Sequence, residues 1–432
     1  TFAQDPAKHF DTLQIHAGLE PDPTTGAAAL PIYASAAFQF DSAPDAAAKF
    51  ALSKPGNVYG RLTNTTTDAV AARVAAIEGA TGAVAVASGH AAEILALTNI
   101  VGAGDHIVAS DSLYGGTWNI FLHTLGDLGV ETTFVENNDI DAFVAATKEN
   151  TKLWYVETIG NPLADVADVP AIVEAANSLK EPVPVFVDNT FATPYLYRPA
   201  DDGAAVVIES LTKWIGGHGA TLGGAVIDTG KFDWKKTPGK FPTLTEPDPS
   251  YHGLVFADAA PAAPFSTRVL ANKLRDFGPT LSPYAAQLIG IGIETLSLRA
   301  QRHSDNALAV AKYLESHPKV SWVRYSGLEN DPSHEVASRI LHNGFGGVVV
   351  FGVKGGRDAG LKVVDNVKLF THLANVGDAK SLIIHPASTT HSQLTPEQLK
   401  AAHLTEDLIR LSVGIENVDD IIADLDQALE NA

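Results

Sequence analysis

The feature that most constrains the fold is an alternation of short apolar runs with amphipathic segments between about residues 68 and 208. The apolar runs have strand length, and the segments between them carry a helical pattern. Buried strands that alternate with helices form a mostly parallel sheet covered on both faces. We expect strands at 83–87, 106–109, 130–135, 152–156, 184–188 and 204–208, and helices that include 68–78, one from about Gly89, and 168–179.

The flanking regions are organised differently. Residues 1–60 are rich in Ala, Pro and Asp and indicate an arm, and residues 229–262 indicate a long insertion. A helical region over about 264–315 precedes a smaller α/β unit from about 319. Its expected elements are strands near 346–353 and 408–413 and a last helix near 417–429.

The length of 432 residues exceeds what one core usually holds. We therefore expect an N-terminal arm over 1–60, a sheet domain over 61–275 and a C-terminal domain over 276–432.

Composition excludes several classes of function. The formal net charge of −20 argues against nucleic acid or an anionic membrane as partner. The chain has no Cys, which excludes thiolate metal sites and a catalytic thiol. The start has no apolar core and no uninterrupted apolar run reaches membrane-spanning length, so we expect a cytoplasmic protein. Met is also absent, and we interpret the double absence as removal of sulfur by selection or redesign.

Polar clusters follow two of the expected strands. Ser88, Gly89 and His90 lie between a strand and a helix, where free amides bind anions; an ordinary strand-to-helix turn is the alternative. Asp188 ends the run 184–188, where a carboxylate either keeps a pyridine nitrogen protonated or caps a turn.

Lys213 follows another strand, in Ser210-Leu211-Thr212-Lys213. A lysine in a partly dry pocket loses its charge and becomes a nucleophile or base. Ser210 and Thr212 stand at alternate positions, so both hydroxyls could reach one phosphate. Arg61 suits a phosphate and Arg410 a substrate carboxylate, although in isolation the sequence around each favours a surface salt bridge.

Competing motifs are incomplete. The glycine-rich run 216–224 lacks the ending of a P-loop, and Gly290-Ile291-Gly292 lacks the third glycine of a dinucleotide fingerprint. His385 and His391 do not have the partner spacing of metal ligands, so capping or hydrogen bonding is predicted for them, and no metal site is predicted.

Taken in order, the clusters resemble the Cys/Met-metabolism family of pyridoxal-phosphate (PLP) enzymes over nearly the whole chain. The resemblance implies the PLP-dependent transferase fold type I, as in aspartate aminotransferase. The motifs that carry it are Tyr59-Gly60-Arg61, Glu157-Thr158-Ile159-Gly160-Asn161-Pro162, Asp188-Asn189-Thr190, Ser210-Leu211-Thr212-Lys213 and Arg410-Leu411-Ser412-Val413-Gly414.

Carried over by position, the resemblance implies a role for each residue. Lys213 holds PLP as a Schiff base and moves protons, Asp188 pairs with the ring nitrogen, and Tyr114 stacks on the ring. Tyr59 and Arg61 reach the phosphate from a neighbouring subunit, and Tyr114 and Tyr59 are proton relays. The other implied contacts are Ser88, Gly89, His90, Ser210 and Thr212 at the phosphate, Asn161 and Thr190 at the cofactor, and Arg410 with Asn375 at the substrate carboxylate.

Within the family, the insertion and Asn375 resemble the O-acetylhomoserine sulfhydrylase branch. This branch implies conversion of O-acetylhomoserine and sulfide to homocysteine and acetate in methionine biosynthesis, by a homotetramer built as a dimer of dimers. A cystathionine γ-synthase or a methionine γ-lyase of the same family is the alternative, and a non-catalytic binding or assembly module is the alternative of another class. The chain departs from the family at His90, where Gln or Met is usual, and at Glu209, where His is usual.

Overall fold

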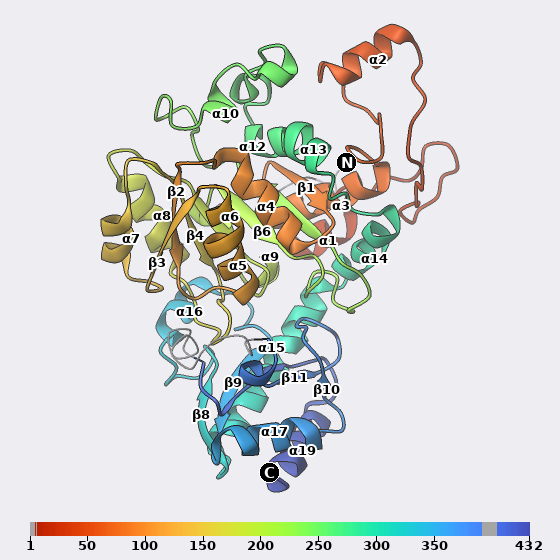
Figure 1. Cartoon of the computed structure of the whole chain (residues 1–432). Coiled ribbons are helices and arrows are strands. Elements are labelled where there is room, and N and C mark those ends of the chain that lie inside the picture. The colour runs from red at the N-terminus through yellow and green to blue at the C-terminus, as the bar shows by residue number, and fades with distance from the viewer. Residues whose placement is uncertain (1–4, 6, 391–403) are drawn as a thin grey trace.

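The computed structural model describes residue 5, residues 7–390 and residues 404–432. Two sheets organise the chain (Figure 1). The larger has seven strands in the order β1-β7-β6-β5-β4-β2-β3, and all of them run parallel except β7, which is antiparallel to both neighbours. The strands are β1 (Gly82–Val86), β2 (His106–Ser110), β3 (Glu131–Val135), β4 (Thr151–Glu157), β5 (Val185–Asp188), β6 (Val206–Glu209) and β7 (Gly224–Asp228).

The expected mostly parallel sheet is confirmed, and each of the six expected strands is present within two residues of its expected bounds. β7 was not predicted. Successive residues of a strand face opposite sides, and both sides of this sheet are buried. On β4, Trp154 and Val156 enter one core, whereas Leu153 and Tyr155 enter the other.

Helices that cover the sheet begin at polar caps. Asn64 caps α3 (Thr65–Glu78), Ser88 caps α4 (Gly89–Ile100) and Asp168 caps α8 (Val169–Ser178), each by accepting a backbone N–H. The other helices of this part are α1 (Phe10–His16), α2 (Ala43–Phe50), α5 (Gly115–Asn119), α6 (Leu125–Asp127), α7 (Ile140–Ala146), α9 (Thr193–Leu196), α12 (Pro264–Arg268), α13 (Arg275–Phe277) and α14 (Pro283–Ile293).

The N-terminal region and the insertion take different positions. Residues that include α2 project from the body of the molecule (Figure 1). The insertion carries the short helices α10 (Pro242–Thr245) and α11 (Phe256–Ala259) and packs against the sheet domain through its aromatic side chains. Trp234 stacks on Phe265 with 5.2 Å between the ring centroids.

The second sheet has the order β10-β11-β12-β9-β8, with antiparallel pairs except β10 with β11. Its strands are β8 (Val320–Arg324), β9 (Val348–Val353), β10 (Thr371–His372), β11 (Leu382–Ile384) and β12 (Leu408–Ser412), and its helices are α15 (Leu296–Ser316), α16 (His334–Ile340), α17 (Gly356–Asn366) and α19 (Val418–Glu430). The expected strands at 346–353 and 408–413 and the last helix are confirmed; β8, β10 and β11 were not predicted.

The two faces of the second sheet have different neighbours. Ile409 and Leu411 of β12 pack with α15, α17 and α19, whereas Leu408 joins the core of the larger sheet. Because side chains alternate along a strand, Arg410 shares the face of Leu408 and points toward the larger domain. Within the described residues, no helix is both long and apolar enough to cross a bilayer.

Candidate active site

A cavity of about 270 Å³ lies beyond the carboxyl ends of β4, β5 and β6, and Arg410 of the second sheet also lines it. Ligands of open α/β sheets bind at this edge. Twelve of the fourteen predicted site residues line it: Ser88, Gly89, His90, Tyr114, Asn161, Asp188, Thr190, Ser210, Thr212, Lys213, Asn375 and Arg410.

Lys213 is half-buried in the turn that follows β6. Its Nζ donates to Asn375 Oδ1 at 2.6 Å. Burial, with a smaller effect of the Arg410 charge, lowers the pKa of Lys213 to about 8. A fraction of the amine is therefore neutral near physiological pH, which a nucleophile or base requires.

Asp188 is the last residue of β5, and its Oδ1 accepts the Thr190 N–H at 2.9 Å. Burial raises the pKa of this carboxyl. Within the described part of the chain, no Lys, Arg or His forms an ion pair with Asp188. A carboxylate in a cavity without a cation of its own fits a ligand that brings a protonated nitrogen.

The N-terminus of α4 forms another wall of the cavity. The side chain of Ser88 accepts the Ala91 N–H, so the chain turns into the helix at Gly89. A Cβ on Gly89 would lie 2.8 Å from the Ser210 Cβ, so this approach requires glycine. Thr212 Oγ1 accepts the Gly223 N–H at 3.0 Å. Helix amides and hydroxyls gathered in this way fit a phosphate group.

Tyr114 provides an aromatic face at the cavity, with 48% of its surface exposed. Its ring centroid lies 5.5 Å from that of His90. Burial, followed by the Lys213 charge, lowers the pKa of His90. The Tyr114 N–H donates to Glu157 Oε1 at 2.7 Å, which fixes the backbone from which the ring projects.

Arg410 is buried on β12, and its Nη1 donates to Asn161 Oδ1 at 3.2 Å. Burial lowers the pKa of Arg410 to about 10. The alternative interpretation of Arg410, a surface salt bridge, does not match its buried position. Among the described residues the guanidinium makes no other hydrogen bond, so its remaining donors suit a carboxylate ligand.

Tyr59 and Arg61 lie outside the cavity of their own chain. The Arg61 carbonyl accepts from Thr280 Oγ1 at 3.0 Å, and its guanidinium lies 5.1 Å from the Tyr59 ring. Tyr59 is 42% exposed. Their contribution to a neighbouring subunit stays a prediction.

Sequence reasoning missed several residues that line the cavity. Glu157 appeared only as part of a motif, without a role, and Glu93 was not singled out. Both carboxyls are buried, and burial followed by the Asp188 charge raises the pKa of each. The others are Thr117, Ile159, Phe191, Leu222, Ala374, Val376 and Thr390. An isolated Glu or an apolar residue carries no pattern that separates it from ordinary surface or core positions.

Glu78 and Glu209 form a buried pair of acids beneath the site. Glu78 Oε1 accepts from Asn189 Nδ2 at 3.3 Å, and both glutamates are fully buried. Burial raises the pKa of both carboxyls, and the neighbouring Glu78 raises that of Glu209 further. Two neighbouring negative charges that are buried away from water are costly, so the folded state keeps protons on these carboxyls.

This pair predicts a pH-dependent stability. Unfolded glutamates titrate near pH 4.3, and the folded values are higher, so the stabilising protons are lost as the pH rises above about 4.3 through the folded values. Replacing Glu209 with Gln should increase the free energy of unfolding at pH 8 by about 1 kcal/mol or more, and by less at pH 5. Urea denaturation at both pH values measures this; an equal change at both would contradict it.

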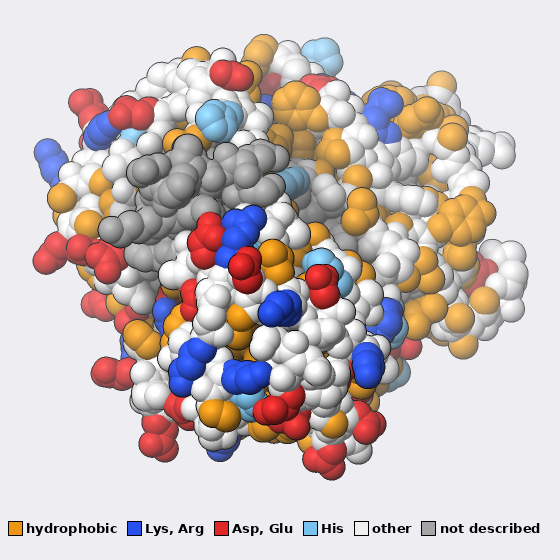
Figure 2. Space-filling view, turned by 60° about the horizontal axis from the view of Figure 1, so that its bottom comes forward, with side chains coloured by type: hydrophobic (Ala, Val, Ile, Leu, Met, Phe, Trp, Pro, Cys, Tyr) orange, Lys and Arg blue, Asp and Glu red, His pale blue; other side chains and the backbone are white. Residues whose placement is uncertain are grey.

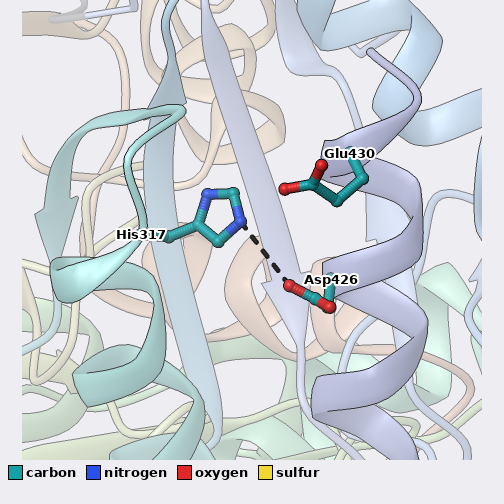
Figure 3. Close-up of side chains that lie close together, drawn as sticks. All are labelled: His317, Asp426 and Glu430. Atoms are coloured by element: carbon teal, nitrogen blue, oxygen red, sulfur yellow. Dashed lines mark ion pairs between the residues drawn. The ribbon is translucent and has the colours of Figure 1, made fainter.

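A group outside the cavity meets the distance requirement for metal ligands. His317 lies opposite Asp426 and Glu430 of α19 (Figure 3). His317 Nδ1 accepts the Lys319 N–H at 3.2 Å, which places the ring proton on Nε2, 3.7 Å from Asp426. With its proton on Nε2, the ring offers no lone pair to a metal there, and 3.7 Å is beyond hydrogen-bond distance, so the contact with Asp426 is a loose one.

His385 is hydrogen-bonded, as predicted, to Ser388 Oγ and to the Glu406 carbonyl, both at 2.8 Å. His391 lies outside the described residues.

Comparisons with known proteins agree with this geometry. A homocysteine synthase of Schizosaccharomyces pombe is 50% identical, with 99% of each chain covered, and an O-acetyl-L-homoserine sulfhydrylase of Corynebacterium glutamicum is 49% identical, with 96% of each covered. The crystal structure of a Campylobacter jejuni protein named as an O-acetylhomoserine (thiol)-lyase superposes with a TM-score of 0.94 at 39% identity, over 98% of this chain and 100% of the other. That crystal structure contains N'-pyridoxyl-lysine-5'-monophosphate.

The architecture is the PLP-dependent transferase fold type I. The cavity residues fit the ring nitrogen and the phosphate of PLP, and Lys213 supplies the amine to which PLP attaches. A sequence model of the Cys/Met metabolism PLP-dependent enzymes matches residues 11–430. The chain belongs to this family of PLP-dependent enzymes.

Proposed function

We propose that the chain is an O-acetylhomoserine sulfhydrylase, which converts O-acetyl-L-homoserine and hydrosulfide to L-homocysteine and acetate. The bond from the substrate γ-carbon to the acetate oxygen breaks, and a carbon–sulfur bond replaces it. The observation that carries the proposal is full-length identity of 49–50% to relatives with these names, joined to a cavity that contains Lys213 and Arg410.

The role of each residue in the reaction follows from where its side chain lies. When bound, PLP withdraws electrons from the substrate α-carbon and makes its proton removable. Lys213 Nζ takes and returns protons, since its pKa of about 8 suits both directions near neutral pH. Arg410 and Asn375, which also line the cavity, orient the substrate carboxylate. The Tyr114 hydroxyl relays a proton near the departing acetate, with Tyr59 of the partner subunit as a second relay.

Product analysis tests this proposal. The purified protein would be incubated separately with O-acetylhomoserine plus sulfide, O-acetylhomoserine plus cysteine, and methionine. We expect homocysteine and acetate from the first mixture as the fastest reaction. Faster formation of cystathionine from the second would favour a cystathionine γ-synthase, and a 2-oxo acid with ammonia from the third would favour a γ-lyase. A protein with neither PLP absorbance nor turnover would be a binding module.

We further propose that the active unit is at least a dimer, within a tetramer built as a dimer of dimers. The support is the position of Tyr59 and Arg61 outside their own cavity, together with exposed apolar side chains. Figure 2 shows hydrophobic side chains gathered on the side where the arm projects. Large hydrophobic residues exposed in the arm and on α14 include Ile32, Phe50, Leu52, Tyr284, Leu288 and Ile291. Patches of this kind mark protein–protein contacts.

Hybrid assembly tests the shared site. Variants Arg61→Ala and Lys213→Ala should each have little activity alone. When the two chains are refolded or expressed together, a hybrid has one site with both Lys213 and Arg61 intact, so activity should return. No recovery in a hybrid shown to form by mass would contradict the shared site.

A further inference from the structure

The loop between β4 and α8 joins the two domains at the cavity. It carries Asn161, which accepts the hydrogen bond from Arg410 of the second sheet. Within the loop, the Gly160 N–H donates to the Asp165 carbonyl at 2.8 Å, and Ile159 pairs with Val166 as an isolated bridge. Asp165 therefore closes the turn that presents Asn161.

The carboxylate of Asp165 reaches two further elements. One oxygen forms an ion pair with Arg324 of β8, in the second sheet. The other accepts from Ser112 Oγ at 3.4 Å, and Ser112 lies two residues before Tyr114. Arg324 is itself held by Asp331, through an Nε to Oδ2 contact of 3.0 Å.

Asp165 thus contacts three segments that each carry a cavity residue or its sheet, two of them through its carboxylate and one through its backbone carbonyl. They are the segment of Tyr114, the turn of Asn161, and the sheet that carries Arg410. We propose that Asp165 is a positioning residue, whose pairing with Arg324 sets the distance of Arg410 from the large-domain half of the site. The inference rests on the proposed function, because it assigns the substrate carboxylate to Arg410.

The surroundings make Asp165 suitable for a conservative change. Asp165 and Arg324 line a polar cavity of about 280 Å³, and the side chain of Asp165 is 28% exposed. Replacing Asp165 with Asn keeps its size and leaves Arg324 paired with Asp331. No charge is left buried without a partner, so the fold should tolerate the change.

Asp168 provides a matched control on the same loop. It also pairs with an arginine of the C-terminal part, Arg339 of α16. Its other role is to cap α8, where Asp168 Oδ1 accepts the Ala171 N–H at 3.3 Å, and Asn is an equally good cap. Asp168→Asn therefore removes the same charge and an ion pair to the C-terminal part, without a contact to the Ser112 segment.

The experiment compares steady-state kinetics of Asp165→Asn, Asp168→Asn and the wild-type holoenzyme. We expect Asp165→Asn to lower kcat/KM for O-acetylhomoserine by about 5-fold to 30-fold, mainly through KM. The KM for sulfide and the visible absorbance of bound PLP should not change, because residues of the large domain hold the cofactor. Asp168→Asn should change kcat/KM less than about 2-fold.

Arg324 variants complete the test. Arg324→Gln should raise the same KM, Arg324→Lys should restore most of it, and Asp165→Asn combined with Arg324→Gln should add little to either single change. Equal effects of Asp165→Asn and Asp168→Asn, or full additivity of the pair, would overturn the positioning role. A wild-type enzyme that forms no homocysteine would instead overturn the proposed function.

Discussion

Replacing Lys213 with alanine should abolish turnover and the visible absorbance of bound PLP. The amine is the group in the cavity whose pKa, about 8, suits both attachment of the cofactor and proton transfer. Proton transfer by a positioned group alone contributes about 10²-fold to 10⁴-fold, and loss of attachment adds to this. We therefore expect kcat to fall by more than about 10³-fold, measured as homocysteine formed.

Lys148→Ala is the matched control for this variant. Lys148 pairs with Glu131 at the surface of the sheet domain, and the two side chains are 43% and 61% exposed. Activity and absorbance should match the wild type. Measurable turnover by Lys213→Ala at a tenth of the wild-type rate would exclude Lys213 as the cofactor-bearing base.

Arg410→Ala should weaken use of the amino-acid substrate and leave PLP absorbance intact. The guanidinium is buried and lines the cavity. Truncating one partner of a buried charged contact costs about 2–5 kcal/mol, so kcat/KM for O-acetylhomoserine should fall by about 30-fold or more. Most of the change should appear in KM, and Arg410→Lys should be intermediate because it keeps the charge without the planar fork.

Arg357→Ala controls for loss of an arginine from the same domain. Arg357 forms an exposed pair with Glu406, and such pairs contribute little. If Arg410→Ala had the wild-type KM, or if Arg357→Ala had the same effect, Arg410 would not be the carboxylate ligand.

The fold was largely predictable because the large domain is built from buried parallel strands. Strands such as 106–110 and 151–157 are apolar runs bounded by turns, and this pattern is visible without any contact information. β7 was not predicted because it follows the glycine-rich run 216–224 and lies between β1 and β6 in the antiparallel direction. Pairing between strands so far apart is not encoded in local periodicity.

The site was predictable to the extent that strand ends position it. Asp188 and Lys213 follow neighbouring parallel strands, so their proximity follows from topology. Arg410 comes from the other sheet and was assigned only by resemblance. The pair Asp165 and Arg324 spans 159 positions, and two ordinary surface residue types at that separation give no sequence pattern. The structure was needed to bring them together.

The most direct test of the account is to locate the cofactor on the chain. The purified holoenzyme would be treated with borohydride, which fixes PLP to the lysine that carries it, then digested and mapped by mass spectrometry. We expect a pyridoxyl phosphate mass on Lys213, in the peptide that contains Ser210 and Thr212. Attachment to another lysine, or no modified peptide from an active enzyme, would contradict it.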